Sequence, residues 1–131
     1  MEIDKIALIN IKDGQVLSTR SKGKVNYYLP GGKRESEETD EQTLIREIRE
    51  ELCVEIIPGS YKYIGTFKAQ SDGMKDGILV KMTCYSAKFK GLLKPNNEIE
   101  EIKWLNYADI MTVSAVDKII FDFLKDKGEL E

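Results

Sequence analysis

The sequence predicts a single α/β (α+β) domain in which a mixed β-sheet carries helices on its faces. Segments rich in β-branched and aromatic residues alternate along the chain with two segments of helical periodicity. The 131 residues contain no internal repeat, low-complexity tract or linker, and a chain of this length can bury a substantial hydrophobic core. We therefore expect one domain that covers residues 1–131 and carries one functional site.

The chain is predicted to begin with two antiparallel strands. The stretch KIALINIKDGQVLSTRS places two β-rich runs on either side of Asp13-Gly14, a dipeptide that favours a tight hairpin turn. The next stretch, YYLPGGKRESEE, contains Pro30, Gly31 and Gly32, which interrupt regular structure. We predict a loop there.

A helix is predicted from about Asp40 to Leu52. Thr39 and Gln42 have the spacing of a capping box, in which each side chain accepts a hydrogen bond from the backbone N–H of the other residue. Apolar residues then recur at helical spacing, at Leu44, Ile45, Ile48 and Leu52.

The second half of the chain is predicted to add strands and a closing helix. EIIPGSYKYIGTFKA and GILVKMTCYSAKFKG have the composition of strands, and the polar stretch QSDGMKDG between them is predicted to be a turn. NNEIEEIKWLNY indicates a further strand that follows an acidic loop. VSAVDKIIFDFLKDKG has helical periodicity and ends with lysines and Gly128, which is typical of a helix C-terminus.

The composition argues against several classes of protein and site. The 20 basic and 23 acidic residues give a net charge of −3, so no strong positive field is expected to attract long nucleic acids. The sequence has no histidine, and Cys53 and Cys84 do not form a C-x-x-C pair, which argues against structural zinc and histidine-based catalysis. The start, MEIDKIALINIKDG, has neither a signal-peptide core nor a transmembrane run. We expect a cytoplasmic protein with no membrane partner.

The predicted helix carries an unusual concentration of acidic residues. LIREIREELCV places Glu47, Glu50 and Glu51 within little more than one turn, although like charges at this spacing destabilise an isolated helix. On a helical wheel the three glutamates lie beside the apolar face, and side chains at i, i+3 and i+4 converge over one patch. Such a patch could hold a hard divalent cation, although a charged helix face is more often simply solvated.

The sequence around this helix resembles the signature of the Nudix hydrolases, G-x5-E-x7-R-E-U-x-E-E-x-G-U, in which U is a bulky aliphatic residue. The stretch GKRESEETDEQTLIREIREELCV, residues 32–54, agrees at every specified position except one, because Cys53 stands where the family has glycine. The flanking stretches YYLPGG and NEIEEIKWLNYADI also resemble the family. A left-handed residue at the family glycine costs a non-glycine residue roughly 1 kcal/mol. Either the helix ends differently here or Cys53 is strained.

The resemblance implies an αβα sandwich that hydrolyses a diphosphate linkage in a nucleoside diphosphate derivative, with Mg²⁺ or Mn²⁺ as cofactor. By position, Glu47, Glu50 and Glu51 resemble the family's metal ligands, and the backbone carbonyl of Gly32 is expected to complete the coordination. Glu47 is also a candidate base. Clustered carboxylates alone would repel an anionic substrate, whereas bound divalent ions reverse the local field and lower the pKa of a coordinated water.

Other positions of the signature imply supporting roles. Arg46 and Glu38 match the positions that orient the loop and the glutamates through an ion pair. We place Arg46 with the catalytic residues and Glu38 as their support. Gly31 and Gly32 are expected to bind substrate, since they let the backbone approach metal and phosphates where a Cβ would obstruct, although Pro-Gly-Gly could equally form a simple turn.

Residues outside the signature are expected to complete the site. Such sites often include a glutamate from a later loop, and of Glu98, Glu100 and Glu101 we prefer Glu98 as a further catalytic residue. Strand alternation is expected to place Glu98 and Glu100 on one face and Glu101 on the other, unless a bulge intervenes. Arg20 occupies a basic position after the hairpin that resembles family members, and we predict that it binds substrate.

Several further residues are weaker candidates for substrate contacts. Lys33 and Arg34 are near enough in sequence to reach phosphates, but basic residues are common on any surface. Four aromatic residues could stack on a nucleobase, although aromatic residues in strands more often belong to the core: Tyr27, Tyr28, Phe67 and Tyr85.

The preferred function is hydrolysis of a nucleoside triphosphate to a monophosphate and pyrophosphate, so the expected partner is a small-molecule nucleotide. The marks of CoA, ADP-ribose and NADH members are not visible in the sequence. A nucleotide sugar or a dinucleotide polyphosphate is the alternative substrate. A catalytically silent Nudix-fold module that binds nucleotides is the alternative function, although Glu47, Glu50 and Glu51 are all present and argue against it. The sequence does not indicate an oligomeric state.

Overall fold

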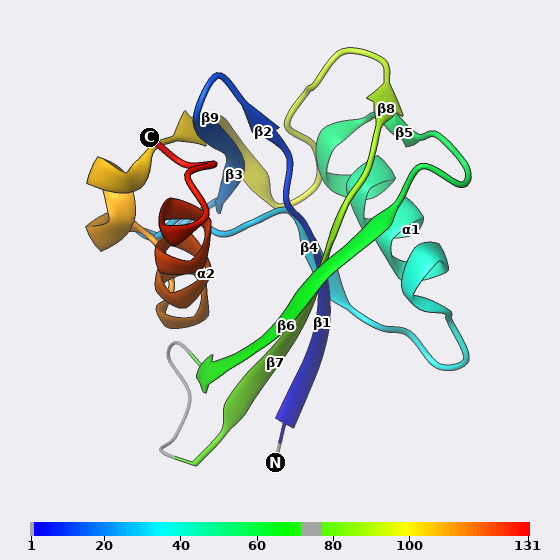
Figure 1. The fold of residues 1–131 in the computed structure, drawn as a ribbon. Helices are drawn as coiled ribbons and strands as arrows, with labels where there is room; N and C mark the ends of the chain where they lie inside the picture. Colours follow the sequence, from blue (N-terminus) through cyan, green and yellow to red (C-terminus); the bar gives the residue numbers. More distant parts are fainter. Residues whose placement is uncertain (1, 72–76) are drawn as a thin grey trace.

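A computed structural model describes residues 2–71 and 77–131, in which β-sheets lie between two helices (Figure 1). Helix α1 spans Asp40–Leu52 and helix α2 spans Ala115–Asp126, and the two lie on opposite sides of the strands. A 3₁₀ helix, η1 (Tyr107–Thr112), precedes α2. The predicted α/β (α+β) class, with a mixed sheet flanked by helices, is confirmed. No helix in this part of the chain is long and apolar enough to cross a membrane.

The largest sheet in the described ranges has four strands in the order β4-β1-β7-β6. Strands β1 and β7 are parallel and the other neighbours are antiparallel. A three-stranded sheet has the order β2-β3-β9, and β5 pairs with β8. The strand bounds are β1 Glu2–Leu8, β2 Ile11–Lys12, β3 Gln15–Ser21, β4 Gly31–Lys33, β5 Glu55–Ile56, β6 Lys62–Gln70, β7 Leu79–Ser86, β8 Phe89–Lys90 and β9 Ile99–Leu105.

Strand β1 and Ile9, the residue that follows it, contribute side chains to two hydrophobic cores, one on each face of the four-stranded sheet. Ile6 and Leu8 belong to the cluster that contains the apolar face of α1, whereas Ala7 and Ile9 belong to the cluster that contains α2. This division follows from the alternation of side chains along a strand. The buried helix residues are Leu44, Ile48 and Leu52 in α1, and Ile120, Phe121 and Leu124 in α2.

Helix α1 has the predicted bounds and the predicted capping box. The Gln42 backbone N–H donates to Thr39 Oγ1 at 3.1 Å, and the Thr39 N–H donates to Gln42 Oε1 at 2.9 Å. At the other end Cys53 has φ 61°, and its N–H donates to the Arg49 carbonyl oxygen at 3.2 Å. The helix therefore ends in the left-handed geometry, and Cys53 adopts it without the freedom of glycine.

Two predictions about the first part of the chain were incomplete. The first β-rich run is split, because β1 pairs with β7 whereas only β2 forms the hairpin with β3. The stretch predicted to be a loop contains strand β4, whose glycines pair with β1 in spite of the adjacent proline. The turn predicted over residues 70–77 lies largely outside the described residues, since 72–76 are not described.

Candidate active site

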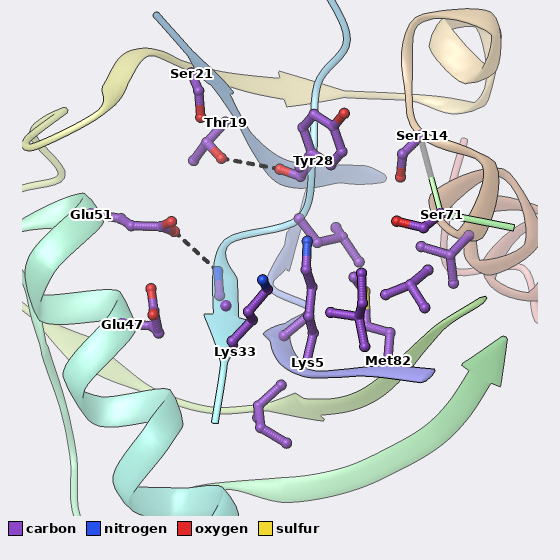
Figure 2. A pocket seen from close by; sticks show the side chains of 18 of the residues that line it. Lys5, Thr19, Ser21, Tyr28, Lys33, Glu47, Glu51, Ser71, Met82 and Ser114 are labelled. Carbon is purple, nitrogen blue, oxygen red and sulfur yellow. Dashed lines mark hydrogen bonds between the residues drawn. The ribbon is translucent and has the colours of Figure 1, made fainter. Parts of the chain in front are cut away.

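A cavity of about 520 Å³ lies over one face of the four-stranded sheet (Figure 2). Carboxylates of Glu47 and Glu51 line one side of it, and both residues come from α1. Glu98, from the turn before β9, also lines the cavity. Ser71, Met82 and Ser114 lie on the opposite side (Figure 2), and further apolar residues of the Met82 core cluster also line the cavity: Leu29, Val80 and Val116. The cavity therefore has an acidic side and a largely apolar side.

Glu51 is the most deeply buried of the acidic residues that line the cavity. Its residue exposure is only 6%. Its Oε1 accepts a hydrogen bond of 3.0 Å from the Gly31 backbone N–H. Burial raises the pKa of Glu51 to about 8, and the neighbouring charges of Glu47 and Glu98 act in the same direction, whereas Gly31 and Lys5 act against it. A buried carboxylate among other carboxylates is costly, so this position favours a bound cation.

The two glycines of β4 allow the carboxylates of α1 to reach the cavity past the edge of the sheet. A Cβ on Gly32 would lie 2.5 Å from the Glu47 carboxyl group. Gly31 has φ 143°, and a Cβ there would lie 2.0 Å from the Ile6 carbonyl oxygen. Only glycine fits at these positions without a shift of the neighbouring atoms. The backbone of β4 therefore approaches the Glu47 carboxylate closely, and the predicted approach to metal and phosphates stays a prediction.

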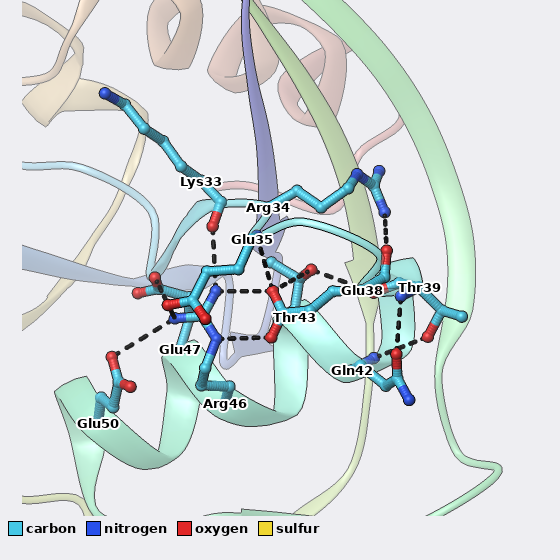
Figure 3. Close-up of polar contacts among 10 residues, drawn as sticks. All are labelled: Lys33, Arg34, Glu35, Glu38, Thr39, Gln42, Thr43, Arg46, Glu47 and Glu50. Carbon is cyan, nitrogen blue, oxygen red and sulfur yellow. Dashed lines mark hydrogen bonds and ion pairs between the residues drawn. The ribbon is translucent and has the colours of Figure 1, made fainter.

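Arg46 binds several of the acidic residues around the start and middle of α1 (Figure 3). Its Nε and Nη2 donate to both oxygens of Glu38, at 2.7 and 2.9 Å. Its Nη1 donates to Glu47 Oε1 at 2.9 Å and lies 3.6 Å from Glu50 Oε2. The ion pair with Arg46 lowers the pKa of Glu38 to about 2, with the Glu35 backbone as the next cause. The ion pair that the sequence predicted is present.

Glu47 differs from Glu50 in its surroundings. Burial raises the pKa of Glu47, and the charges of Glu50 and Glu98 add to this, whereas Arg46 lowers it. The Glu50 side chain is 44% exposed and contacts Arg46. Glu50 is not among the residues that line the cavity.

Of the three later glutamates, Glu98 lines the cavity and the other two bind Arg20. Arg20 Nη1 lies 2.8 Å from Glu100 Oε1, and Arg20 Nε lies 3.3 Å from Glu101 Oε1. The expected alternation fails because the β3–β9 register shifts between Arg20 and Ser21. The structure thus does not bring Arg20, predicted to bind substrate, to the cavity. Two carboxylates from the neighbouring strand hold it elsewhere.

No three acidic or cysteine side chains within residues 2–71 and 77–131 are arranged as ligands of one ion. Arg46 binds Glu47 and Glu50, whereas Glu51 is hydrogen-bonded to Gly31. The residues nevertheless fit a hard divalent cation, because oxygen donors from α1 and the β9 turn line one cavity, where burial and the charges of neighbouring glutamates raise the pKa of Glu47 and Glu51. The glycine backbone at β4 leaves room beside them.

Lys5 and Ser114 line the cavity, although neither was among the site residues that the sequence indicated. Lys5 lies in β1, and the alternation that directs Ala7 and Ile9 toward α2 also directs Lys5 to that face. An inward-facing lysine in an apolar strand was the available signal. Ser114, the N-cap of α2, is 3% exposed, and its Oγ has no hydrogen-bond partner among the described residues.

The aromatic candidates are distributed over different parts of the fold. Tyr28 lines the cavity. Tyr27 donates its hydroxyl to Glu101 Oε1 at 2.6 Å, and the Phe67 ring packs against Phe123. Tyr85 donates its hydroxyl to Asp40 Oδ2. Tyr28 is therefore the only one of the four that the structure brings to the cavity.

Comparisons with known proteins agree with this fold. A family model described as the NUDIX domain matches residues 4–126. A structure from Chromobacterium violaceum, assigned to the nudix hydrolase family, is 28% identical, with 96% of this chain and 78% of that chain covered and a TM-score of 0.75. A MutT NUDIX hydrolase from Burkholderia pseudomallei is 20% identical, with 93% and 97% covered and a TM-score of 0.77, which shows a shared fold. The E. coli ORF135 protein is 23% identical, with 95% and 91% covered and a TM-score of 0.73. No curated protein matches the sequence directly.

Proposed function

The chain belongs to the NUDIX domain family of pyrophosphohydrolases, and from that premise we propose that it hydrolyses a nucleoside triphosphate to a nucleoside monophosphate and pyrophosphate, with Mg²⁺ or Mn²⁺. The proposal depends above all on one observation. Glu51 is buried in the wall of the cavity, among other carboxylates and without an ion pair to a described lysine or arginine. Such a charge is costly to bury unless a ligand compensates it.

In this proposal Glu47, Glu50 and Glu51 hold the metal, with the Gly32 carbonyl and Glu98 as additional donors. The bound cation would neutralise charge on the phosphates and lower the pKa of an attacking water. Gly31 orients Glu51 through its backbone N–H group.

Arg46 and Glu38 have a positioning role in the same proposal. Arg46 fixes the Glu47 carboxylate from one side, and Glu38 fixes Arg46 through two hydrogen bonds. Burial raises the pKa of Glu47, which makes its carboxylate a better acceptor for the proton of the attacking water. Glu98 is the second candidate for that proton, because it also lines the cavity.

The size and character of the cavity favour one nucleotide over two. A volume of about 520 Å³ is within the range of sites for a single small ligand. The apolar side, with Leu29, Val80 and Met82, suits a base and sugar, and the acidic side suits a metal-bound diphosphate. This arrangement supports a nucleoside triphosphate rather than a dinucleotide polyphosphate.

The test is a substrate panel with purified protein and either Mg²⁺ or Mn²⁺. The panel contains ribo- and deoxyribonucleoside triphosphates, nucleotide sugars and dinucleoside polyphosphates, and products are identified by phosphorus NMR. We expect pyrophosphate and a nucleoside monophosphate from at least one triphosphate, at a rate at least about a hundredfold lower after Glu51→Gln. Turnover of nucleotide sugars alone would contradict the proposed substrate. Failure to hydrolyse any compound, together with nucleotide binding, would instead identify a silent binding module.

A further inference from the structure

Two lysines form a directly opposed pair on the cavity side of the four-stranded sheet. Lys5 in β1 and Lys33 in β4 are partners in the antiparallel register, and both line the cavity. Figure 2 shows both side chains extending into the cavity. Directly opposed like charges destabilise a sheet, since the Cβ atoms of such partners lie only about 4.5–5.5 Å apart.

No carboxylate within residues 2–71 and 77–131 forms a direct contact with this pair, and the charge of Lys5 acts on buried Glu51 only across the cavity. Neither ammonium group makes a hydrogen bond or an ion pair with another side chain in residues 2–71 and 77–131. Other basic residues of the same region do have such partners: Arg34 binds Asp4, and Lys68 binds Glu2. A pair of cations that faces a cavity without a carboxylate in direct contact suits an anionic ligand.

The sheet order places the lysine pair between the two sides of the cavity. Lys33, Lys5 and Met82 are consecutive partners on β4, β1 and β7, so they form one row across the sheet. The acidic side lies at the β4 end of this row, where Gly31 contacts Glu51. Met82 belongs to the apolar side, in the core cluster that contains α2.

The buried hydroxyl of Ser114 lies at the far side of the cavity and indicates where the nucleoside would sit. It is nine-tenths or more buried and lacks a hydrogen-bond partner among the described residues. An unpaired buried hydroxyl is costly, and a polar group of a ligand would relieve that cost. A nucleotide with its diphosphate at the carboxylates and its base near Ser114 would cross the lysine row between them.

We infer that Lys5 and Lys33 together bind the phosphate that stays attached to the nucleoside. This inference rests on the proposed function, because it takes the substrate to be a nucleoside triphosphate cut on the far side of that phosphate. One phosphate has enough oxygen acceptors for hydrogen bonds from both ammonium groups. The pair therefore sets a preference for nucleotides over nucleosides that does not depend on the metal.

Binding of the product nucleotide tests the inference without turnover. Calorimetry in EDTA measures the affinities of AMP, CMP, GMP and UMP and of the four corresponding nucleosides. We expect the protein to bind at least one monophosphate about tenfold or more tightly than its nucleoside. Lys5→Gln and Lys33→Gln are each expected to weaken monophosphate binding about tenfold and to leave nucleoside binding unchanged.

Lys81→Gln is the matched control, because it removes the same charge from the same sheet. Lys81 pairs with Asp4 in the register, one residue from the Lys5 row, so it lies on the other face. We expect the control to bind monophosphates within twofold of the unaltered protein. Loss of the like-charge pair should raise the melting temperature of Lys33→Gln by about 1 to 4 °C in the absence of ligand. If Lys5→Gln does not fold, Lys33→Gln and the charge-preserving Lys5→Arg carry the comparison.

Two results would overturn the inference. One is that no monophosphate binds more tightly than its nucleoside, and the other is that Lys5→Gln and Lys81→Gln have equal monophosphate affinities. Failure of the proposed function is a separate result, since it would appear as absence of triphosphate hydrolysis with metal. If the protein binds monophosphates through the two lysines but does not hydrolyse triphosphates, the phosphate subsite is supported and the proposed reaction is refuted.

Discussion

Replacing Glu51 with glutamine is expected to stabilise the metal-free protein at alkaline pH while abolishing most of its activity. The folded-state pKa of Glu51 is raised to about 8 from an ordinary value of 4.5, chiefly by burial. Between pH 4.5 and about pH 8, Glu51 therefore keeps a proton in the folded protein that it has released in the unfolded chain. The contribution of Glu51 to the free energy of unfolding is fully present below about pH 4.5. It is lost as the pH rises toward 8.

The size of this effect follows from the two pKa values. Each pKa unit corresponds to about 1.4 kcal/mol, so ionised Glu51 destabilises the metal-free fold by about 3 to 5 kcal/mol at pH 8. The neutral amide of Glu51→Gln avoids this cost, and its oxygen can still accept the Gly31 hydrogen bond. We expect the variant to exceed the unaltered protein by about that amount at pH 8 and by less than about 1 kcal/mol at pH 5.

The assay is chemical denaturation in EDTA at pH 5 and pH 8. Glu50→Gln is the control, since it makes the same charge change at a side chain that is 44% exposed and paired with Arg46. It should show no comparable gain at pH 8. Glu51→Gln should also lower kcat by at least about a hundredfold with metal present. Equal stability of Glu51→Gln and the unaltered protein at pH 8 would refute the reasoning about burial.

Four further substitutions test other parts of the site. Glu50→Gln is expected to lower kcat by at least about a hundredfold with the fold intact, and near-normal turnover would refute its role as a ligand. Cys53→Gly should keep activity and raise the free energy of unfolding by up to about 1 kcal/mol, because glycine adopts φ 61° without strain. A clearly lower free energy of unfolding in a denaturant titration would contradict this. Gly31→Ala should cost more than about 2 kcal/mol in the same titration, since its Cβ would meet the Ile6 carbonyl oxygen, and an unchanged midpoint would show that the strand can move. Arg20→Gln should change KM for the triphosphate less than about threefold, because two carboxylates hold the guanidinium away from the cavity. A tenfold rise in KM would instead support the predicted contact between Arg20 and the substrate.

Local chemistry made α1 predictable, and the same chemistry explains what was missed around it. The capping box of Thr39 and Gln42 depends on neighbours in sequence, as does the periodicity of the apolar face. Strand β4 depends instead on pairing between Gly31–Lys33 and β1, which no local signal reports. The split of the first run at Asn10 has the same origin, because two different sheets receive its two parts.

In the candidate site too, contacts between residues close in sequence were predictable, whereas contacts set by strand pairing were not. Glu38 and Arg46 were predicted as partners because the signature fixes their spacing, and the structure places them 2.7 Å apart. Arg20 was assigned by its position after the hairpin, but its environment is set by strand β9, about eighty residues later. Lys5 lay in a strand whose facing direction was predictable, yet its opposition to Lys33 required the register of a strand that was not predicted.

The structure also explains how α1 tolerates three glutamates within little more than one turn. Arg46 forms ion pairs with Glu47 and Glu50, which offsets part of their mutual repulsion in the absence of metal. Glu51 is different, because it is buried behind β4 and accepts its hydrogen bond from a neutral backbone group, the Gly31 N–H. If the helix were merely solvated, the least compensated carboxylate should be the most exposed one, whereas here it is the most buried. That inversion is expected of a residue retained for a ligand, since proteins keep costly buried charges chiefly where binding requires them.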